Sequence, residues 1–147
     1  MMPRIRVNGV LIEDNKILLV EQDVSERRRW AHPGGKPEFG ETMEQAIIRE
    51  MKEETGLDVS VDCLLYVTDR ISRDDHRVII SFQVSRQGGK LGEGTGDWTE
   101  FDEGKIRSVR MVPLDELREL GFSSTYCELV KACFPDKGSY KGTILND

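Results

Sequence analysis

The feature that most constrains the fold is the segment 35–57, in which a glutamate-rich stretch lies between two glycines. The spacing predicts a helix over residues 43–55. Thr42 with Gln45 three residues later matches a capping box, which satisfies the free backbone amides at a helix N-terminus. Gly56 stands where a left-handed C-terminal cap belongs. The segment therefore has both a start and a stop signal.

The predicted helix places its acids beside its apolar stripe. At about 100° per residue, three glutamates share one side: Glu50, Glu53 and Glu54. Three apolar side chains form the adjoining stripe: Ile47, Ile48 and Met51. Like charges four residues apart repel each other, and burial adds a desolvation cost. A divalent cation resolves both problems, and magnesium prefers oxygen ligands. The alternative is a solvated helix with scattered charges.

The rest of the chain indicates a mixed sheet covered on both faces by helices, because strands precede and follow the central helix. Two hairpins are expected, one around Asp14-Asn15 and one around residues 72–75. The expected strands are 4–12, 16–20, 59–71, 77–84 and 106–112, and the expected short helices are 114–120 and 125–134. Ser123-Ser124 offers an N-cap to the last helix. Residues 87–104, rich in glycine and acid, predict a mobile connection.

From Gly35 the chain reads Gly-x5-Glu41-x7-Arg49-Glu50-Met51-x-Glu53-Glu54-x-Gly56-Leu57. This pattern resembles the Nudix box at every defined position. Seven fixed residues at a frequency of ~7% each coincide by chance with a probability of ~10⁻⁸ per starting point. The resemblance implies the α/β class with a Nudix-type α/β/α sandwich, a mixed β-sheet flanked by helices. It also implies one domain over residues 1–147, with a tail after about residue 135 that we expect to be loosely ordered.

The resemblance implies a role for each residue of the box. The expected ligands of Mg2+, or of Mn2+ in its place, are Glu50, Glu53 and Glu54, directly or through water. Arg49 is expected to orient a neighbouring glutamate by a charge-assisted hydrogen bond. Glu41 is expected to support the loop or the outer shell of the metal. Gly35 and Gly56 are expected to serve backbone geometry that a Cβ obstructs.

Similarity to the family also implies the reaction, cleavage of a nucleoside diphosphate linked to a group X. Hydrolysis of a phosphoanhydride needs charge neutralisation, a positioned water and a base. Relatives take the base either from a box glutamate, here Glu53 or Glu54, or from a later loop. The loop candidates are Glu93, Glu100 and Glu103. Glu103 is the preferred one because it lies shortly before the strand at Ile106; a solvated loop acid is the alternative for each.

Four further features are candidate substrate contacts, each with a structural alternative. Lys36 follows Gly-Gly directly, as in the MutT-like branch, and either meets phosphate oxygens or is a solvated lysine. The run Arg27–Arg29, with Arg29 nearest the box, either steers an anionic substrate or is a surface run. Trp30 either stacks on a base or is a half-buried strand aromatic. His32, next to Pro33, is a candidate for the same cleft.

The subgroup signatures of the family mostly do not appear, and the context of Lys36 favours nucleoside triphosphates, including oxidised ones. The proline that marks ADP-ribose enzymes is absent near Ser72 and Arg73, and the tyrosine that marks dinucleoside polyphosphate enzymes is replaced by Asp74 and Asp75. An ADP-ribose or nucleotide-sugar pyrophosphatase is the alternative. A non-catalytic nucleotide-binding regulator is disfavoured because every box carboxylate is present. An isoprenyl diphosphate isomerase is disfavoured because Cys63 lies in an apolar strand.

Length, charge and cysteine content narrow the remaining classes of protein. A length of 147 residues fits one domain. A net charge of −6 argues against non-specific nucleic-acid binding, and it requires positive charge to be supplied locally for an anionic substrate. The chain has no apolar run near the ~18 residues of a membrane span and no signal-peptide pattern. The three cysteines lack CxxC spacing and are expected to be reduced. These features together predict a cytoplasmic protein. The family resemblance also allows a homodimer.

Overall fold

The computed structural model describes residues 2–22, 30–92 and 106–144. The elements in chain order are β1 (Arg4–Val10), β2 (Ile12–Glu13), β3 (Lys16–Gln22), β4 (Trp30–Ala31), β5 (Gly34–Gly35), α1 (Met43–Thr55), β6 (Leu57–Ile71), β7 (His76–Gly89), β8 (Ile106–Pro113), a 3-10 turn (Leu114–Glu116), α2 (Ser124–Lys131) and β9 (Ser139–Tyr140). None of the helices described is long and apolar enough to cross a membrane.

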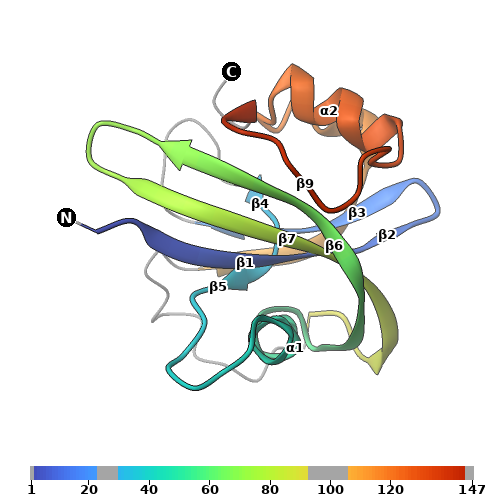
Figure 1. Ribbon diagram of the computed structural model, residues 1–147. Coiled ribbons are helices and arrows are strands. Elements are labelled where there is room, and N and C mark those ends of the chain that lie inside the picture. Colours follow the sequence, from blue (N-terminus) through green and yellow to red (C-terminus); the bar gives the residue numbers. More distant parts are fainter. Residues whose placement is uncertain (1, 23–29, 93–105, 145–147) are drawn as a thin grey trace.

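The strands form two sheets. The larger has the order β5-β1-β7-β6-β9, and the smaller joins β2, β3 and β4, with β8 pairing with β3. The larger sheet is mixed, because β1 runs parallel to β7 while β6 and β7 form a long antiparallel hairpin. Figure 1 shows α1 on one side of the sheets and α2 on the other. The expected α/β class with a mixed sheet flanked by helices is confirmed.

Each helix covers its own apolar cluster. The cluster beneath α1 includes Val7, Leu11, Leu18, Ala46, Ile47, Met51 and Leu57. The cluster beneath α2 includes Val10, Ile17, Leu19, Tyr66, Val112, Tyr126, Val130 and Phe134. Strand β3 sends Leu18 to the first cluster and its neighbours Ile17 and Leu19 to the second, because successive side chains on a strand point to opposite faces. The apolar run of β3 therefore reflects burial on both sides.

The first expected hairpin is only partly correct. Asp14 and Asn15 form the turn, with φ of 50° and 59°, but only Ile12 and Glu13 pair with β3. Strand β1 pairs with β7 of the other sheet instead. The chain changes sheets around Leu11, and parallel pairing buries β1 in a way that no local turn signal indicates.

The elements at the C-terminal end also differ from expectation. The predicted helix at 114–120 is only the 3-10 turn followed by hydrogen-bonded turns. Helix α2 begins at its expected cap, where the Ser123 hydroxyl accepts a hydrogen bond from the Tyr126 amide. It ends at Lys131, before the predicted residue 134, because Cys133 and Phe134 adopt positive φ. Residues 139–140 pair with β6 as β9, although the sequence after Pro135 shows little pattern.

Candidate active site

Helix α1 begins and ends at its predicted residues. The Thr42 side chain accepts a hydrogen bond from the Gln45 amide, and the Gln45 side chain accepts one from the Thr42 amide. At the other end Gly56 is left-handed, with φ of 82°. The buried apolar residues of the helix are Ala46, Ile47 and Met51. Ile48, expected in the apolar stripe, is 40% exposed, because it lies at the far margin of the stripe, away from the sheet.

Strand β5 holds the start of the box against the helix. Gly35 pairs with Val7 of β1, and its α-carbon faces the carboxylate of Glu50. A Cβ at position 35 would lie 2.7 Å from Glu50 Oε1 and 2.8 Å from its carboxyl carbon. Gly34 is as crowded, since a Cβ there would lie 2.0 Å from the carbonyl oxygen of Val7. The two glycines therefore let the β5 backbone approach both the strand and the carboxylate.

Two carboxylates of α1 are almost removed from solvent. Glu50 is 5% exposed and Glu54 1% exposed. The Gly34 amide donates to Glu54 Oε1 at 3.4 Å, but within the described part of the chain Glu50 Oε2 and Glu54 Oε2 have no hydrogen-bond partner. Burial, followed by the neighbouring Glu50 carboxyl, raises the pKa of Glu54 well above its ordinary value. Two buried acids with unsatisfied oxygens need either a proton or a cation.

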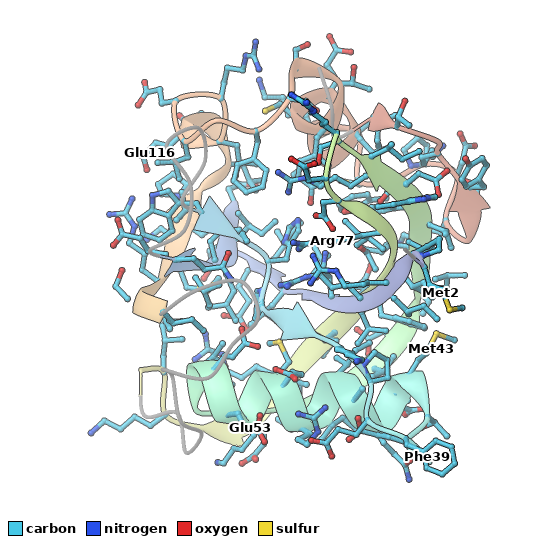
Figure 2. The ribbon with its side chains drawn as sticks, turned by 90° about the vertical axis from the view of Figure 1, so that its left-hand side faces the viewer. Met2, Phe39, Met43, Glu53, Arg77 and Glu116 are labelled. Atoms are coloured by element: carbon cyan, nitrogen blue, oxygen red, sulfur yellow. The ribbon has the colours of Figure 1, made fainter. Side chains whose placement is uncertain are left out.

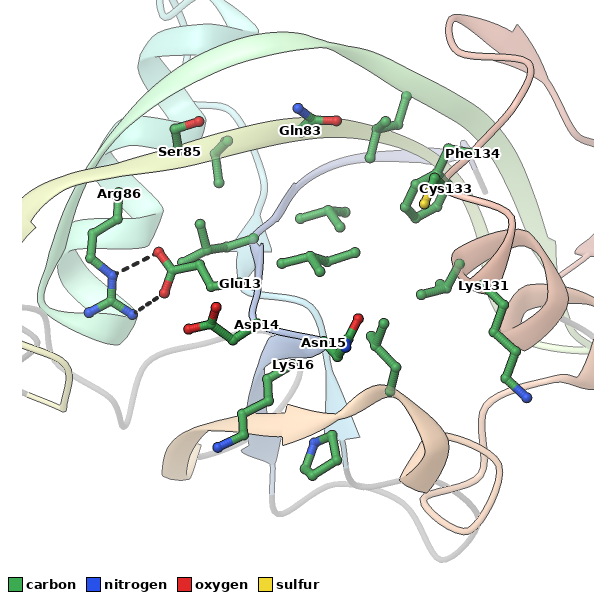
Figure 3. Close-up of a pocket in the computed structure, with 18 of the residues that line it drawn as sticks. Glu13, Asp14, Asn15, Lys16, Gln83, Ser85, Arg86, Lys131, Cys133 and Phe134 are labelled. Carbon is green, nitrogen blue, oxygen red and sulfur yellow. Dashed lines mark hydrogen bonds and ion pairs between the residues drawn. The ribbon is translucent and has the colours of Figure 1, made fainter.

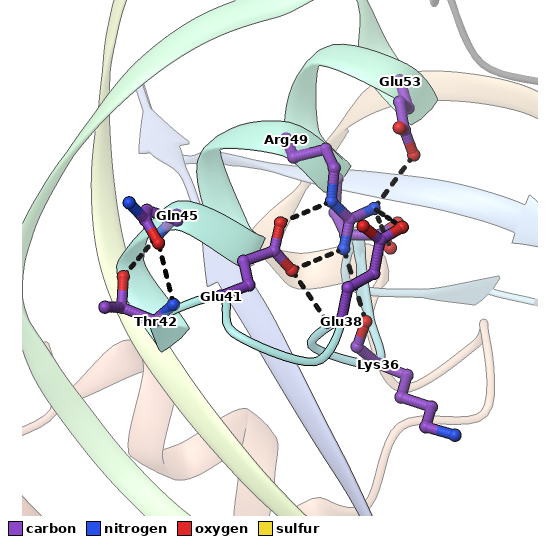
Figure 4. Close-up of polar contacts among 8 residues, drawn as sticks. Lys36, Glu38, Glu41, Thr42, Gln45, Arg49 and Glu53 are labelled. Carbon is purple, nitrogen blue, oxygen red and sulfur yellow. Dashed lines mark hydrogen bonds and ion pairs between the residues drawn. The ribbon is translucent and has the colours of Figure 1, made fainter.

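Arg49 holds the outer carboxylates together (Figure 4). It donates to both oxygens of Glu41, from Nε at 2.7 Å and from a terminal nitrogen at 2.9 Å. It also donates to Glu50 Oε1 at 2.9 Å and to Glu53 Oε2 at 3.2 Å. These hydrogen bonds lower the pKa of Glu41 and raise that of Arg49 further above its already high value. Burial raises the pKa of Glu53.

These contacts decide which oxygens are open to a cation. Within the described ranges, no group of three or more His, Cys, Asp or Glu side chains is arranged to hold a metal ion. Glu53 and one oxygen of Glu50 are held by Arg49, which leaves Glu50 Oε2 and Glu54 Oε2. Mg2+ is typically bound by one or two carboxylates together with water and substrate phosphates. The two orphaned oxygens therefore fit a magnesium ion with this partly open ligand set.

One site residue has no counterpart in the sequence prediction. Arg6 of β1 is only 7% exposed; it donates to Asn8 Oδ1 at 2.8 Å and to the His32 carbonyl at 3.0 Å. Its positive charge acts on Glu54, where it partly offsets the effects that raise the carboxyl pKa. Arg6 alternates with apolar residues on β1, which indicates a strand but gives no sign that this arginine lies inside the molecule.

The candidate substrate residues differ in their surroundings, and some of them lie outside the described residues. Lys36 is exposed, and Figure 4 shows its side chain pointing away from Arg49. Trp30 is half-buried against the α2 cluster, and the Arg110 guanidinium lies 4.9 Å from the centre of its ring. Arg29 and Glu103 lie outside the described residues, as do Arg27, Arg28, Glu93 and Glu100.

His32 is buried between the box and α2. It is 6% exposed, and its Nε2 lies 2.6 Å from the Tyr126 hydroxyl oxygen. Its ring also meets Phe122 edge-on, at 6.0 Å between ring centres. This residue therefore ties the segment before Gly34-Gly35 to α2.

A separate pocket of about 890 Å³ opens near the turn between β2 and β3. It is bordered by the end of β7, the 3-10 turn and the end of α2, and Figure 3 shows the ion pair between Arg86 and Glu13 on its rim. None of the residues that line it belongs to the segment 35–57. The pocket is therefore distinct from the carboxylates of α1.

Comparisons with protein families and known proteins agree with the geometry of the α1 carboxylates. The NUDIX domain model matches residues 2–132. The chain belongs to the Nudix hydrolase family. An ADP-ribose pyrophosphatase of Methanocaldococcus jannaschii is 42% identical over 95 residues, which is 63% of this chain and 56% of that protein. An 8-oxo-dGTP diphosphatase of Proteus vulgaris is 40% identical over 67 residues, 46% of this chain and 60% of that protein. The Nudix chain thus spans a little over half the length of each of these relatives.

Solved structures show the same fold. A UDP-X diphosphatase superposes with a TM-score of 0.69 at 23% identity, covering 96% of this chain and 68% of that one. A NUDIX hydrolase from Nitrosomonas europaea gives 0.66 at 23% identity, covering 90% and 91%. At this level of identity the likeness concerns the fold of the Nudix domain.

Proposed function

We propose that this Nudix protein is a magnesium-dependent hydrolase that cleaves the phosphoanhydride of a nucleoside diphosphate linked to a group X. The observation that carries the proposal is the pair of buried, unpartnered oxygens, Glu50 Oε2 and Glu54 Oε2. Two such carboxylates repel each other and are poorly solvated, so their charged forms are stable together only beside a cation. Mn2+ meets the same requirement for oxygen ligands.

Each residue has a separate task in this proposal. Glu50 and Glu54 hold the metal, which when bound neutralises phosphate charge and polarises the reacting phosphorus centre. Arg49 holds Glu50 in position through the bond at 2.9 Å and takes its own orientation from the two bonds to Glu41. Glu53, with 32% of its side chain exposed, is the ligand or base reached through water. Glu103 stays the loop alternative for the base.

The substrate is proposed only by class. The names of the relatives divide between ADP-ribose and 8-oxo-dGTP, and Lys36 favours a nucleoside triphosphate, normal or oxidised. An ADP-ribose or nucleotide-sugar substrate is the second candidate, favoured by the longer match to the Methanocaldococcus jannaschii enzyme.

The test is turnover on a panel of substrates by three proteins. Purified wild type with Mg2+ is assayed on oxidised and normal nucleoside triphosphates, ADP-ribose, nucleotide sugars and dinucleoside polyphosphates. Glu54→Gln is expected to lower kcat about 100-fold or more, because metal charge stabilisation is worth several kcal/mol and ~1.4 kcal/mol is a factor of ten. Glu44→Gln, an exposed glutamate in the first turn of the same helix, is the matched control and is expected to match wild type.

A metal-binding measurement separates a lost ligand from a misfolded variant. Calorimetric titration with Mn2+ is expected to show weaker binding by Glu54→Gln and unchanged binding by Glu44→Gln. The hydrolase proposal fails if wild type turns over none of the panel or if Glu54→Gln retains its rate.

A further inference from the structure

Three arginines form a row across the larger sheet. Arg4 of β1 is paired with Arg77 of β7, and Arg77 is paired with Arg70 of β6. Residues directly opposed on adjacent strands project from the same face of a sheet. Because neighbouring strands are about 4.8 Å apart, the row spans about 10 Å. We call Arg4, Arg70 and Arg77 the arginine row; Figure 2 shows Arg77 between the level of α1 and that of α2.

The arginine row continues toward the carboxylates through Arg6. Arg6 lies two residues beyond Arg4 on β1, so it projects from the same face about 7 Å further along the strand. It contacts the carbonyl of His32, two residues before Gly34, whose amide donates to Glu54. The arginine face thus begins beside the proposed metal site and extends away from it.

Two buried hydroxyls lie on the same face with no partner. Thr68 and Arg6 are both paired with Ile79, and Ser81 is paired with Tyr66. Thr68 and Ser81 are fully buried, and neither Thr68 Oγ1 nor Ser81 Oγ has a hydrogen-bond partner among the described residues. A buried hydroxyl without a partner costs free energy, and these two place uncharged polar groups in the interior on the same face as Arg6.

The charge of this face opposes that of the chain. Around the row, the described positions on this face of β1, β7 and β6 carry no acid: Arg4, Arg6, Asn8, Arg77, Ile79, Ser81, Arg70, Thr68 and Tyr66. An acid appears only further along the described part of the face, where Gln83 of β7 donates to Asp62 Oδ2 of β6. Asp75 of the β6–β7 turn pairs with Arg4 at 2.8 Å and with Arg77 at 2.7 Å. Four arginines on one face of a protein with a net charge of −6 make a local positive field suited to an anion.

We infer that the substrate carries a phosphate group beyond the diphosphate that is cleaved, and that the arginine row together with Arg6 binds it. The inference rests on the proposed function, since it names the substrate class of the same site. Guanidinium groups bind phosphate oxygens through paired hydrogen bonds. The further phosphate is either the third phosphate of a triphosphate chain or an ester on a sugar. A base stacked on the same arginines is the competing occupant.

Matched substrate pairs test the inference. Each pair differs by one phosphate: ATP against ADP for the triphosphate chain, and NADPH against NADH for the sugar ester. Wild type is expected to prefer the phosphate-bearing member of at least one pair roughly tenfold or more in kcat/KM. The pair that shows the preference identifies where the phosphate is attached. Equal kcat/KM within both pairs overturns the inference and favours the stacked base.

Variants assign the preference to the arginine row. Arg77→Gln and Arg70→Gln are each expected to bring the ratio within the preferred pair close to one. Arg86→Gln is the matched control, because Arg86 lies on the same strand as Arg77 but pairs with Glu13 at the distant pocket; it is expected to keep the wild-type ratio. A preference that survives both row variants overturns the assignment.

A binding measurement without metal is independent of turnover. In EDTA, ribose 5-phosphate is expected to bind wild type and the control Glu44→Gln alike, and to bind Arg77→Gln and Arg70→Gln at least about tenfold more weakly; ribose is the uncharged reference. If wild type binds neither ribose 5-phosphate nor inorganic phosphate, the inference is overturned. If wild type binds ribose 5-phosphate but hydrolyses nothing, the proposed hydrolase fails while the phosphate site stands.

Discussion

At the scale of single residues, the site depends on close approaches that only one side chain permits. Gly35 is the sharpest case, because the space that a Cβ would take is filled by the Glu50 carboxylate, 2.7 Å away at Oε1. Gly35 therefore influences catalysis indirectly, because it determines where the proposed metal ligand Glu50 lies.

Gly35→Ala is therefore expected to impair metal binding more than folding. The new methyl group displaces the Glu50 carboxylate, and displaced support of a metal ligand typically costs about 10- to 100-fold in affinity or activity. Gly88→Ala is the control, since a Cβ there meets nothing closer than Asp58 Oδ2 at 3.7 Å. Mn2+ titration and kcat measure the effect; equal values for both variants would contradict it.

The raised pKa of Glu54 makes the stability of the metal-free protein fall as pH rises. A carboxyl whose pKa is raised on folding binds its proton more tightly in the folded state. Its stabilising contribution is present below its ordinary pKa of 4.5 and is lost as pH rises through the folded-state value. In EDTA, Glu54→Gln is expected to gain Tm relative to wild type at pH 8 and to gain less at pH 5. Glu41, whose pKa is lowered below 4.5, has the opposite sign: its contribution is present above 4.5 and is lost as pH falls through the folded-state value. Glu41→Gln should therefore lose stability at pH 8 and at pH 5 alike, and lose less at about pH 3.

At the scale of elements, α1 is set by local signals, and the sheets are not. The capping box and the left-handed Gly56 lie within residues 42–56, so their effect does not depend on the rest of the fold. The pairing of β1 with β7 joins residues more than seventy positions apart, and short strands such as β5 and β9 have no periodicity to detect. This difference explains why the helix ends were predicted correctly, whereas the expected hairpin between the first two strands was only partly correct and the pairing of β1 with β7 was not predicted.

Thr42→Ala is expected to lower the free energy of unfolding by about 1 kcal/mol, because it removes the acceptor for the Gln45 amide. Thr42→Ser keeps a hydroxyl and is expected to stay within about 0.5 kcal/mol of wild type. Urea unfolding of the three proteins measures the difference, and equal losses in both variants would show that the threonine methyl, and not the cap, is responsible.

At the scale of the whole molecule, the fold brings together arginines that lie far apart in the sequence. The run Arg27–Arg29 is the most concentrated basic cluster along the chain and was the predicted steering patch, but it lies outside the described residues. The arginine row joins residues from three strands that no sequence window contains. The expected homodimer stays a prediction.

What the sequence by itself determined is the α1 segment: its ends, the acids beside its apolar stripe, the family, and the class of chemistry that such acids imply. These follow from contacts within about a dozen residues, where spacing alone decides which side chains meet. Only the tertiary structure decided which carboxylate oxygens remain without partners, that Arg6 is buried beside Glu54, and that four arginines share one face. Those facts depend on strand register, which is set by the burial of distant apolar residues and not by any local pattern.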